Sequence, residues 1–192
     1  MAYSIDYPED WIGIPHFGEG EVFATAEAWA EALAGEIVAP LGLFGRKKER
    51  RAALAETFAF VAQELEKGGA HWGYAWLASV DGPLRFVAVM GLARADIGDA
   101  PAAELAGADG HGDYVPPIVR EITAAAGATG VYVERHSPMD DEAPLVQVIS
   151  GSYAFERSDG VVLMQASTTD MAGYEAFRPH YEEFARSFRW DD

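Results

Sequence analysis

The stretch from Val161 to Trp190 constrains the fold more than any other part of the sequence. It opens with residues that favour a pleated surface, VVLMQASTTD, and continues as MAGYEAFRPHYEEFARSFRW. In the second part, aromatic residues recur at steps of three and four: Tyr174, Phe177, Tyr181, Phe184 and Phe188. This spacing places all the rings on one side of a helix, which then needs a broad sheet to cover. Pro179 predicts that the helix either kinks there or has its main body beginning there.

The rest of the chain supplies the sheet and further helices. Residue patterning predicts strands at 3–7, 71–80, 84–94, 129–136, 145–156 and 161–169, and helices at 25–37, 46–67 and 118–126 before the closing helix. Consecutive strands joined by short turns are antiparallel, and helices bracket them. The predicted fold class is therefore α+β, an α/β/α sandwich with a mostly antiparallel sheet of about six strands and helices on both faces.

Several local features place the strands within this sheet. Pro8 follows the first strand and predicts that it lies at an edge, because proline cannot donate to a ladder. Asp81-Gly82 predicts the turn of a hairpin between 71–80 and 84–94. The second strand of this hairpin is apolar on both faces, which predicts a central position. In the first strand, Trp72, Tyr74 and Trp76 share one face and are predicted to be core residues.

Composition restricts the classes of partner. The net charge is −17, from 31 acidic and 14 basic residues, which argues against nucleic-acid binding and fits a basic protein partner or simple solubility. There is no cysteine, signal peptide or apolar run of the roughly 18 residues that a membrane span needs. A cytoplasmic protein is expected. No linker or repeat interrupts residues 1–192, so a single domain is predicted.

The sequence contains no recognised catalytic or cofactor motif. No nucleophile elbow, phosphate-binding loop, dinucleotide fingerprint or H-E-x-x-H pattern occurs, so no catalytic residue, cofactor or metal is predicted. Asp109 and Asp113 flank glycines but lack the ordered ligands of a calcium loop, and a solvated loop is expected. A hydrolase or ligand-binding enzyme remains the alternative, with a site assembled in space from histidines and acidic residues: His16, His71, His136 and His180.

Two groups of residues are candidates for binding a protein partner. Trp11, His16 and Phe17 lie near a glycine-containing loop, and Trp11 and His16 are expected to be exposed. The second group is basic and opens the helix at 46–67, where the helix dipole disfavours cations. It consists of Arg46, Lys47, Lys48, Arg50 and Arg51. This group predicts a solvated helix start or a docking patch for an acidic partner or another copy of the chain, which would give a homodimer.

The two ends of the chain resemble the Mog1/PsbP-like superfamily, which includes bacterial DUF1795-type and LpqN-type proteins. The resemblance rests on a first strand that runs into Tyr7-Pro8-Glu9-Asp10-Trp11, a late β-hairpin, and a closing helix that ends in Phe184-Ala185-Arg186-Ser187-Phe188-Arg189-Trp190. It implies an α/β/α sandwich that binds proteins and carries no shared catalytic residues. The helices at about 25–67 are longer than the superfamily requires and read as an insertion.

These observations lead to one hypothesis and two alternatives. The chain is expected to be a non-enzymatic cytoplasmic protein-binding domain, such as an adaptor or chaperone of a secretion or toxin system. A chaperone of apolar helices requires an open apolar groove on the surface. The alternatives are the histidine-based enzyme and a self-associating structural domain.

Overall fold

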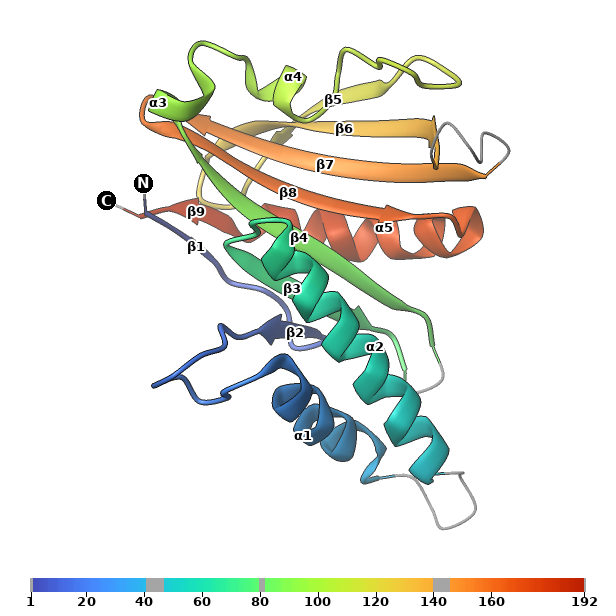
Figure 1. Ribbon diagram of the computed structural model, residues 1–192. Helices are drawn as coiled ribbons and strands as arrows, with labels where there is room; N and C mark the ends of the chain where they lie inside the picture. The colour runs from blue at the N-terminus through green and yellow to red at the C-terminus, as the bar shows by residue number, and fades with distance from the viewer. Residues whose placement is uncertain (1, 41–46, 80–81, 140–145, 192) are drawn as a thin grey trace.

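A computed structural model describes residues 2–40, 47–79, 82–139 and 146–191 (Figure 1). Residues of some predicted features lie outside these ranges, among them Arg46 of the basic cluster and Asp81 of the first hairpin turn.

The described residues form a seven-stranded antiparallel sheet in the order β2-β3-β4-β8-β7-β6-β5. The strands are β2 (Trp11–Ile14), β3 (Trp72–Leu77), β4 (Leu84–Ala93), β5 (Ile118–Thr123), β6 (Thr129–Pro138), β7 (Gln147–Arg157) and β8 (Gly160–Thr168). Helices lie on both faces, so the α+β class is confirmed with one strand more than expected. The apolar strand β4 is central, as its two-faced pattern predicts.

Helix α5 (Met171–Arg186) covers one face of the sheet with its aromatic side. Asp170 caps its first turn by accepting a hydrogen bond from the Gly173 amide at 2.9 Å. Tyr174, Phe177, Tyr181 and Phe184 are buried against β3, β4, β7 and β8. The helix runs through Pro179, so its main body does not begin there. Burial of each ring stabilises the fold by roughly 1.5–3 kcal/mol.

Two separate pairs of helices lie on the opposite face (Figure 1). Helices α1 (Ala26–Val38) and α2 (Lys47–Lys67) pack over β2, β3 and β4 around Trp29, Phe58 and Ala75. The short helices α3 (Arg94–Ile97) and α4 (Ala102–Leu105) pack near β6, β7 and β8. Between the two pairs, β8 exposes Gln165 and Ser167 to solvent. The part of this face that lies between the two helix pairs therefore presents polar side chains to solvent.

The two ends of the chain pair with each other rather than with the large sheet. Strand β1 (Tyr3–Ile5) forms an antiparallel two-stranded sheet with β9 (Phe188–Trp190). The prediction that the first strand lies at an edge of the main sheet is therefore wrong. The closing helix also ends earlier than predicted, at Arg186, because Phe188 leaves it and stacks on Phe155 at 4.4 Å between ring centroids.

The helix predicted at 118–126 is the edge strand β5. Four of its six residues are β-branched, and they pair with β6 from Ile118↔Glu134 to Thr123↔Thr129. The Ala124 amide donates to the Ala128 carbonyl at 2.8 Å and closes a tight hairpin. The preceding Pro116-Pro117 is compatible with a helix start, but proline is also tolerated at the beginning of an edge strand.

The aromatic face of β3 is only partly core. Tyr74 and Trp76 are buried under α5, as predicted. Trp72, on the same face, is 42% exposed and lies beyond the cover of the helix. Its ring contacts His16 instead, with 4.5 Å between the ring centroids.

The tightest approach of α5 to the sheet generates a prediction about Gly151 on β7. A Cβ atom at this position would overlap the Tyr174 hydroxyl oxygen. Gly151→Ala is therefore expected to lower the free energy of unfolding by about 1–3 kcal/mol, measured by urea denaturation. Gly35→Ala is the matched control, because a Cβ there meets only ordinary contacts with Arg51, and alanine favours a helix by about 0.5–1 kcal/mol. Adding Tyr174→Phe to Gly151→Ala should recover part of the loss, and additive effects would contradict the packing explanation.

Candidate functional site

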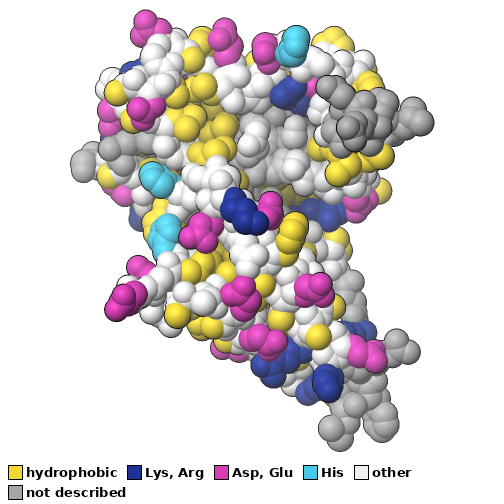
Figure 2. Space-filling model, in the orientation of Figure 1, with side chains coloured by type: hydrophobic (Ala, Val, Ile, Leu, Met, Phe, Trp, Pro, Cys, Tyr) yellow, Lys and Arg dark blue, Asp and Glu magenta, His cyan; other side chains and the backbone are white. Residues whose placement is uncertain are grey.

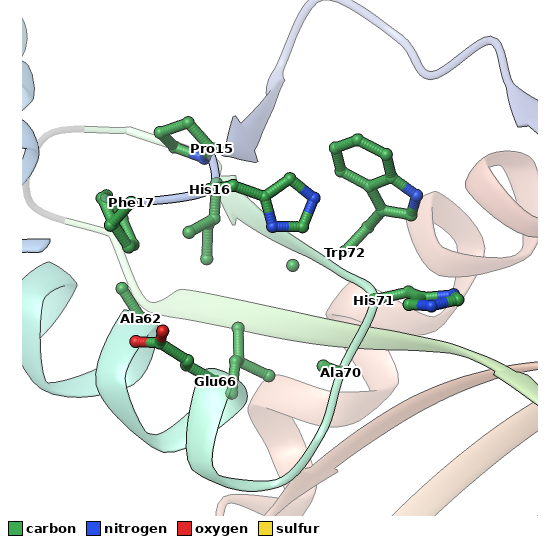
Figure 3. A pocket seen from close by; sticks show the side chains of 11 residues that line it. Pro15, His16, Phe17, Ala62, Glu66, Ala70, His71 and Trp72 are labelled. Carbon is green, nitrogen blue, oxygen red and sulfur yellow. The ribbon is translucent and has the colours of Figure 1, made fainter. Parts of the chain in front are cut away.

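A small cavity lies where β2 ends and the C-terminal end of α2 meets β3 (Figure 3). It brings together His16 and Phe17, two of the predicted binding residues, with His71 and Trp72. The lining residues are Ile14, Pro15, His16, Phe17, Ala62, Leu65, Glu66, Ala70, His71, Trp72 and Gly73. In Figure 3 the His16 ring lies beside Trp72, while the His71 ring points away from both.

The size of this cavity restricts what it can hold. Its volume of about 80 Å³ compares with the roughly 300–1,000 Å³ of a typical small-molecule site. A water molecule takes about 30 Å³ of liquid volume, so there is room for two or three. The cavity can therefore hold ordered water or one inserted side chain of a partner, whereas the alternative of a histidine-based enzyme requires a larger pocket.

Trp11 does not join His16 at the surface, so the prediction that both are exposed is wrong for this residue. It is 4% exposed and stacks on Phe184 of α5 with 4.3 Å between the ring centroids. Its neighbour Asp10 accepts a hydrogen bond at 2.7 Å from the indole nitrogen of Trp76. The start of β2 is thus fixed to the core, and Trp11 contributes stability.

The basic cluster at the start of α2 is used partly to hold α1. Arg51 forms an ion pair with Glu31 at 3.0 Å, and Lys47 donates to the Ala39 carbonyl at 2.9 Å. The lower end of Figure 2 shows basic side chains gathered beside the atoms drawn in grey. Lys48 and Arg50 are on the same helix turn. Contacts within the chain thus explain two of the cations that sequence reasoning assigned to a docking patch.

The four histidines of the alternative enzyme reading do not form one site. His16 and His71 line the small cavity, His180 lies 3.7 Å from Asp10, and His136 is on β6. Among the described residues, no group of three or more His, Asp or Glu side chains could hold a metal ion. Asp113, one of the two aspartates that flank glycines, is enclosed and accepts hydrogen bonds from the Arg135 guanidinium at 2.8 and 2.9 Å. Asp113 is therefore a structural partner of β6.

A buried polar network joins β6, β7 and α5 around Glu134. Tyr132 donates to the Glu134 carboxylate at 2.6 Å, and the Tyr174 hydroxyl lies 3.0 Å from the Tyr132 hydroxyl. Because Tyr132 gives its proton to the carboxylate, Tyr174 is the donor in that contact. The amide of Gln147 lies 2.9 Å from His136 Nδ1, which leaves the Nε2 proton facing Glu134 at 3.4 Å.

The environment of Glu134 favours its charged form. Burial alone would raise the pKa of this carboxyl, but hydrogen bonds from Tyr132 and His136 and the charge of Arg178 outweigh burial and lower it. Burial raises the pKa of Tyr174 to about 12, so this hydroxyl stays protonated. None of the described cavities is lined by Glu134 or His136. The network therefore serves the packing of α5.

Strand β5 is the most exposed strand of the large sheet, and sequence reasoning missed it as a site. Ile118 and Val119 are 47% and 48% exposed, and the adjoining Tyr114 and Val115 are exposed as well. Ala124 bonds to the opposite residue Ala128, so the even-numbered residues of β5 turn their amides and carbonyls toward β6. The backbone amides and carbonyls of Val119 and Glu121 consequently point away from the sheet.

Among the described residues, hydrogen bonds reach the outward edge of β5 only at its C-terminal end. The Arg186 guanidinium donates to the Thr123 carbonyl at 3.0 Å, and the Ala125 amide donates to the Arg186 carbonyl at 2.7 Å. No described residue forms a hydrogen bond with the outward amides of Val119 and Glu121. These groups form an open edge onto which another strand can add.

A cavity lies on each face of β5. On the α4 face, a cavity of about 770 Å³ is lined by Pro101, Ala102, Ala103, Val119, Glu121, Ile122, Thr123, Thr129, Gly130, Val131, Ala154 and Glu156. On the α5 face, one of about 190 Å³ is lined by Arg120, Glu121, Ile122, Tyr132, Tyr153, Glu182 and Arg186. A strand added to β5 would have space for side chains on both of its faces.

Comparisons with known proteins assign no family to this chain. No family model and no curated protein matches the sequence. One similar solved structure is the solution structure of cyanobacterial PsbP (CyanoP) from Synechocystis sp. PCC 6803. It has 12% identity and a TM-score of 0.42 over 99% of this chain and 87% of that chain. No helix among the described residues is long and apolar enough to cross a membrane.

The lowered pKa of Glu134 generates a prediction about pH. A carboxyl whose pKa is lower in the folded state stabilises the fold above its unfolded pKa, near 4.5, and this contribution is lost as the pH falls through the folded value. The wild type should therefore lose more unfolding free energy between pH 6 and pH 3 than Glu134→Gln, measured by urea denaturation. The exposed residue Glu56 provides the control variant, Glu56→Gln, which should follow the wild type. Equal pH dependence for all three proteins would contradict this account of the network.

Proposed function

We propose that this chain is a non-enzymatic protein-binding domain that accepts an extended segment of another protein on the edge of β5. The observation that carries the proposal is the exposed edge itself, with outward amides at Val119 and Glu121 and apolar side chains beside them. This edge carries the charges of Arg120 and Glu121, but no covering element among the described residues hydrogen bonds to its outward amides. Strand addition uses it productively, since main-chain hydrogen bonds supply affinity and flanking cavities select side chains.

The alternatives are less favoured by particular observations. An enzyme needs convergent polar groups in a pocket of adequate size, whereas the cavity at His16 is small and Glu134 lies outside the described cavities. A chaperone of apolar helices needs an open apolar groove, whereas the uncovered face between α2 and α4 presents Gln165 and Ser167. Self-association through the basic cluster competes with contacts that Lys47 and Arg51 already make to α1.

The proposed setting is a cytoplasmic adaptor. The high negative charge disfavours nucleic acid as the partner and favours a protein segment that carries basic groups. A role beside a secretion or toxin system stays a proposal that identification of the partner would test.

Site-specific photo-crosslinking in cells of the source organism tests the docking edge. A benzophenone amino acid replaces Ile118 on β5 or, as the matched control, Phe60, an apolar residue on α2 that is even more accessible, at 61% exposed against 47% for Ile118. We expect a discrete adduct from position 118 alone, with mass spectrometry locating the crosslink in an extended segment of one protein. Identical adducts from both positions would overturn the proposal.

A second variant separates docking from folding. Val119→Pro removes an amide that points away from β6, so the sheet should persist, with an unchanged circular dichroism spectrum, while the adduct is lost. Val119→Lys keeps the amide and places a charge on the exposed edge, and it should reduce the adduct without unfolding the chain. An adduct that survives in both folded variants would place the interaction elsewhere.

A further inference from the structure

The charges of β5 define the chemistry of the segment that it would accept. Resting on the docking function proposed above, we infer that the partner strand is antiparallel, comes from a different protein, and carries a basic residue opposite Glu121, an acidic residue opposite Arg120 and an apolar residue opposite Val119. An antiparallel partner continues the pairing found throughout the large sheet. The rest of the inference follows from the consequences of self-pairing and from the side chains on each face.

A second copy of the chain fits this edge poorly. Two antiparallel copies of β5 must match outward-facing residues with outward-facing residues, so a two-fold axis has to pass through a residue position. The two registers with the greatest overlap are centred on Arg120 and on Glu121. The first places arginine directly opposite arginine, and the second places glutamate opposite glutamate. Like charges in directly opposed positions destabilise a ladder, and two chains of charge −17 also repel each other.

The same two charges have no ion-pair partner among the described residues. Arg120 lies over the ring of Tyr132 at 4.8 Å, and no described cation lies within ion-pair distance of Glu121. By contrast Glu156, at the far side of the α4-face cavity, is already paired with Arg94. A strand beside β5 can therefore form two new cross-strand pairs with Arg120 and Glu121, one on each face of the sheet.

The cavity on the α4 face fits an apolar side chain. Val119 and Glu121 point to this face, and small apolar residues form much of its wall, including Ala102, Ala103 and Ala154. A partner residue opposite Val119 can direct a β-branched or larger apolar side chain toward the cavity, while its neighbour two positions away reaches Glu121. The partner therefore alternates apolar and basic groups on this face and presents an acidic group to Arg120 on the other.

Two synthetic peptides of identical composition test the inference. Acetylated and amidated Thr-Ile-Lys-Glu-Val-Thr places lysine opposite Glu121 and glutamate opposite Arg120, whereas Thr-Ile-Glu-Lys-Val-Thr exchanges the two. Each peptide is titrated into the full chain, and affinity and amide hydrogen exchange are followed by NMR. We expect the first peptide to bind at least about fivefold more tightly, because both cross-strand pairs reverse in the second. It should also protect the amides of Val119 and Glu121 more than those of Ile118 and Arg120, which already face β6.

Charge reversal on the chain provides the decisive control. The variant Arg120→Glu/Glu121→Lys should prefer the second peptide, and Val119→Pro should weaken both peptides. Equal affinity of the two peptides, an unreversed preference, or protection of amides away from β5 would overturn the inferred partner chemistry. A crosslinked partner at Ile118 would still support the docking edge in that case, whereas loss of the crosslink as well would remove both proposals.

Discussion

The burial of the aromatic side of α5 against the large sheet is the interaction on which the rest of the structure depends. Tyr181 lies 2.8 Å from the Met164 carbonyl and 3.1 Å from the Gly151 carbonyl, so its hydroxyl bridges β7 and β8 directly. Phe184 stacks on Trp11 of β2, which is the edge strand at the opposite side of the sheet from β5. One helix thus ties central strands to β2, and the chain ends pair as β1 and β9 just beyond its C-terminus.

The reach of α5 also decides which strand remains open. The last helical residue, Arg186, contacts Thr123 and Ala125 at the C-terminal end of β5 and hydrogen bonds to nothing earlier in that strand among the described residues. The helix therefore fixes the hairpin between β5 and β6 while leaving the outward amides of Val119 and Glu121 without a hydrogen-bond partner among the described residues. At the other edge strand, Trp11 packs under the helix.

The sequence predicts the elements with strong patterns and fails where a pattern has two readings. The three-and-four spacing of Tyr174, Phe177 and Tyr181 fixes α5, and the two-faced apolar run of β4 indicates its central position. The stretch from Ile118 to Thr123 has both β-branched residues and a preceding proline pair, and only pairing with β6 decides for a strand. The candidate site depended on this choice, since a helix at 118–126 would have no open edge.

The errors about exposure have a related cause. The loop beside Trp11 predicts an exposed side chain, but its burial is set by Phe177 and Phe184, which lie more than 160 residues later. Likewise, the basic residues at the start of α2 look unfavourable beside the helix dipole until α1 is seen to supply Glu31 and the Ala39 carbonyl. Local propensity cannot reveal contacts between distant segments, and both corrections come from such contacts.

The adjacent charges on β5 have two physical effects that work in the same direction. Since neighbouring residues of a strand point to opposite faces, Arg120 and Glu121 present opposite charges on the two faces of the sheet. In the two self-paired registers with the greatest overlap, this arrangement places like charges opposite each other, which opposes edge-to-edge assembly of two β5 strands. For a strand of complementary sequence it supplies an attractive pair on each face and fixes the register, because a shift by one residue would exchange the faces. The adjacent charges of Arg120 and Glu121 can thus oppose self-association at this edge and make the edge selective for its partner.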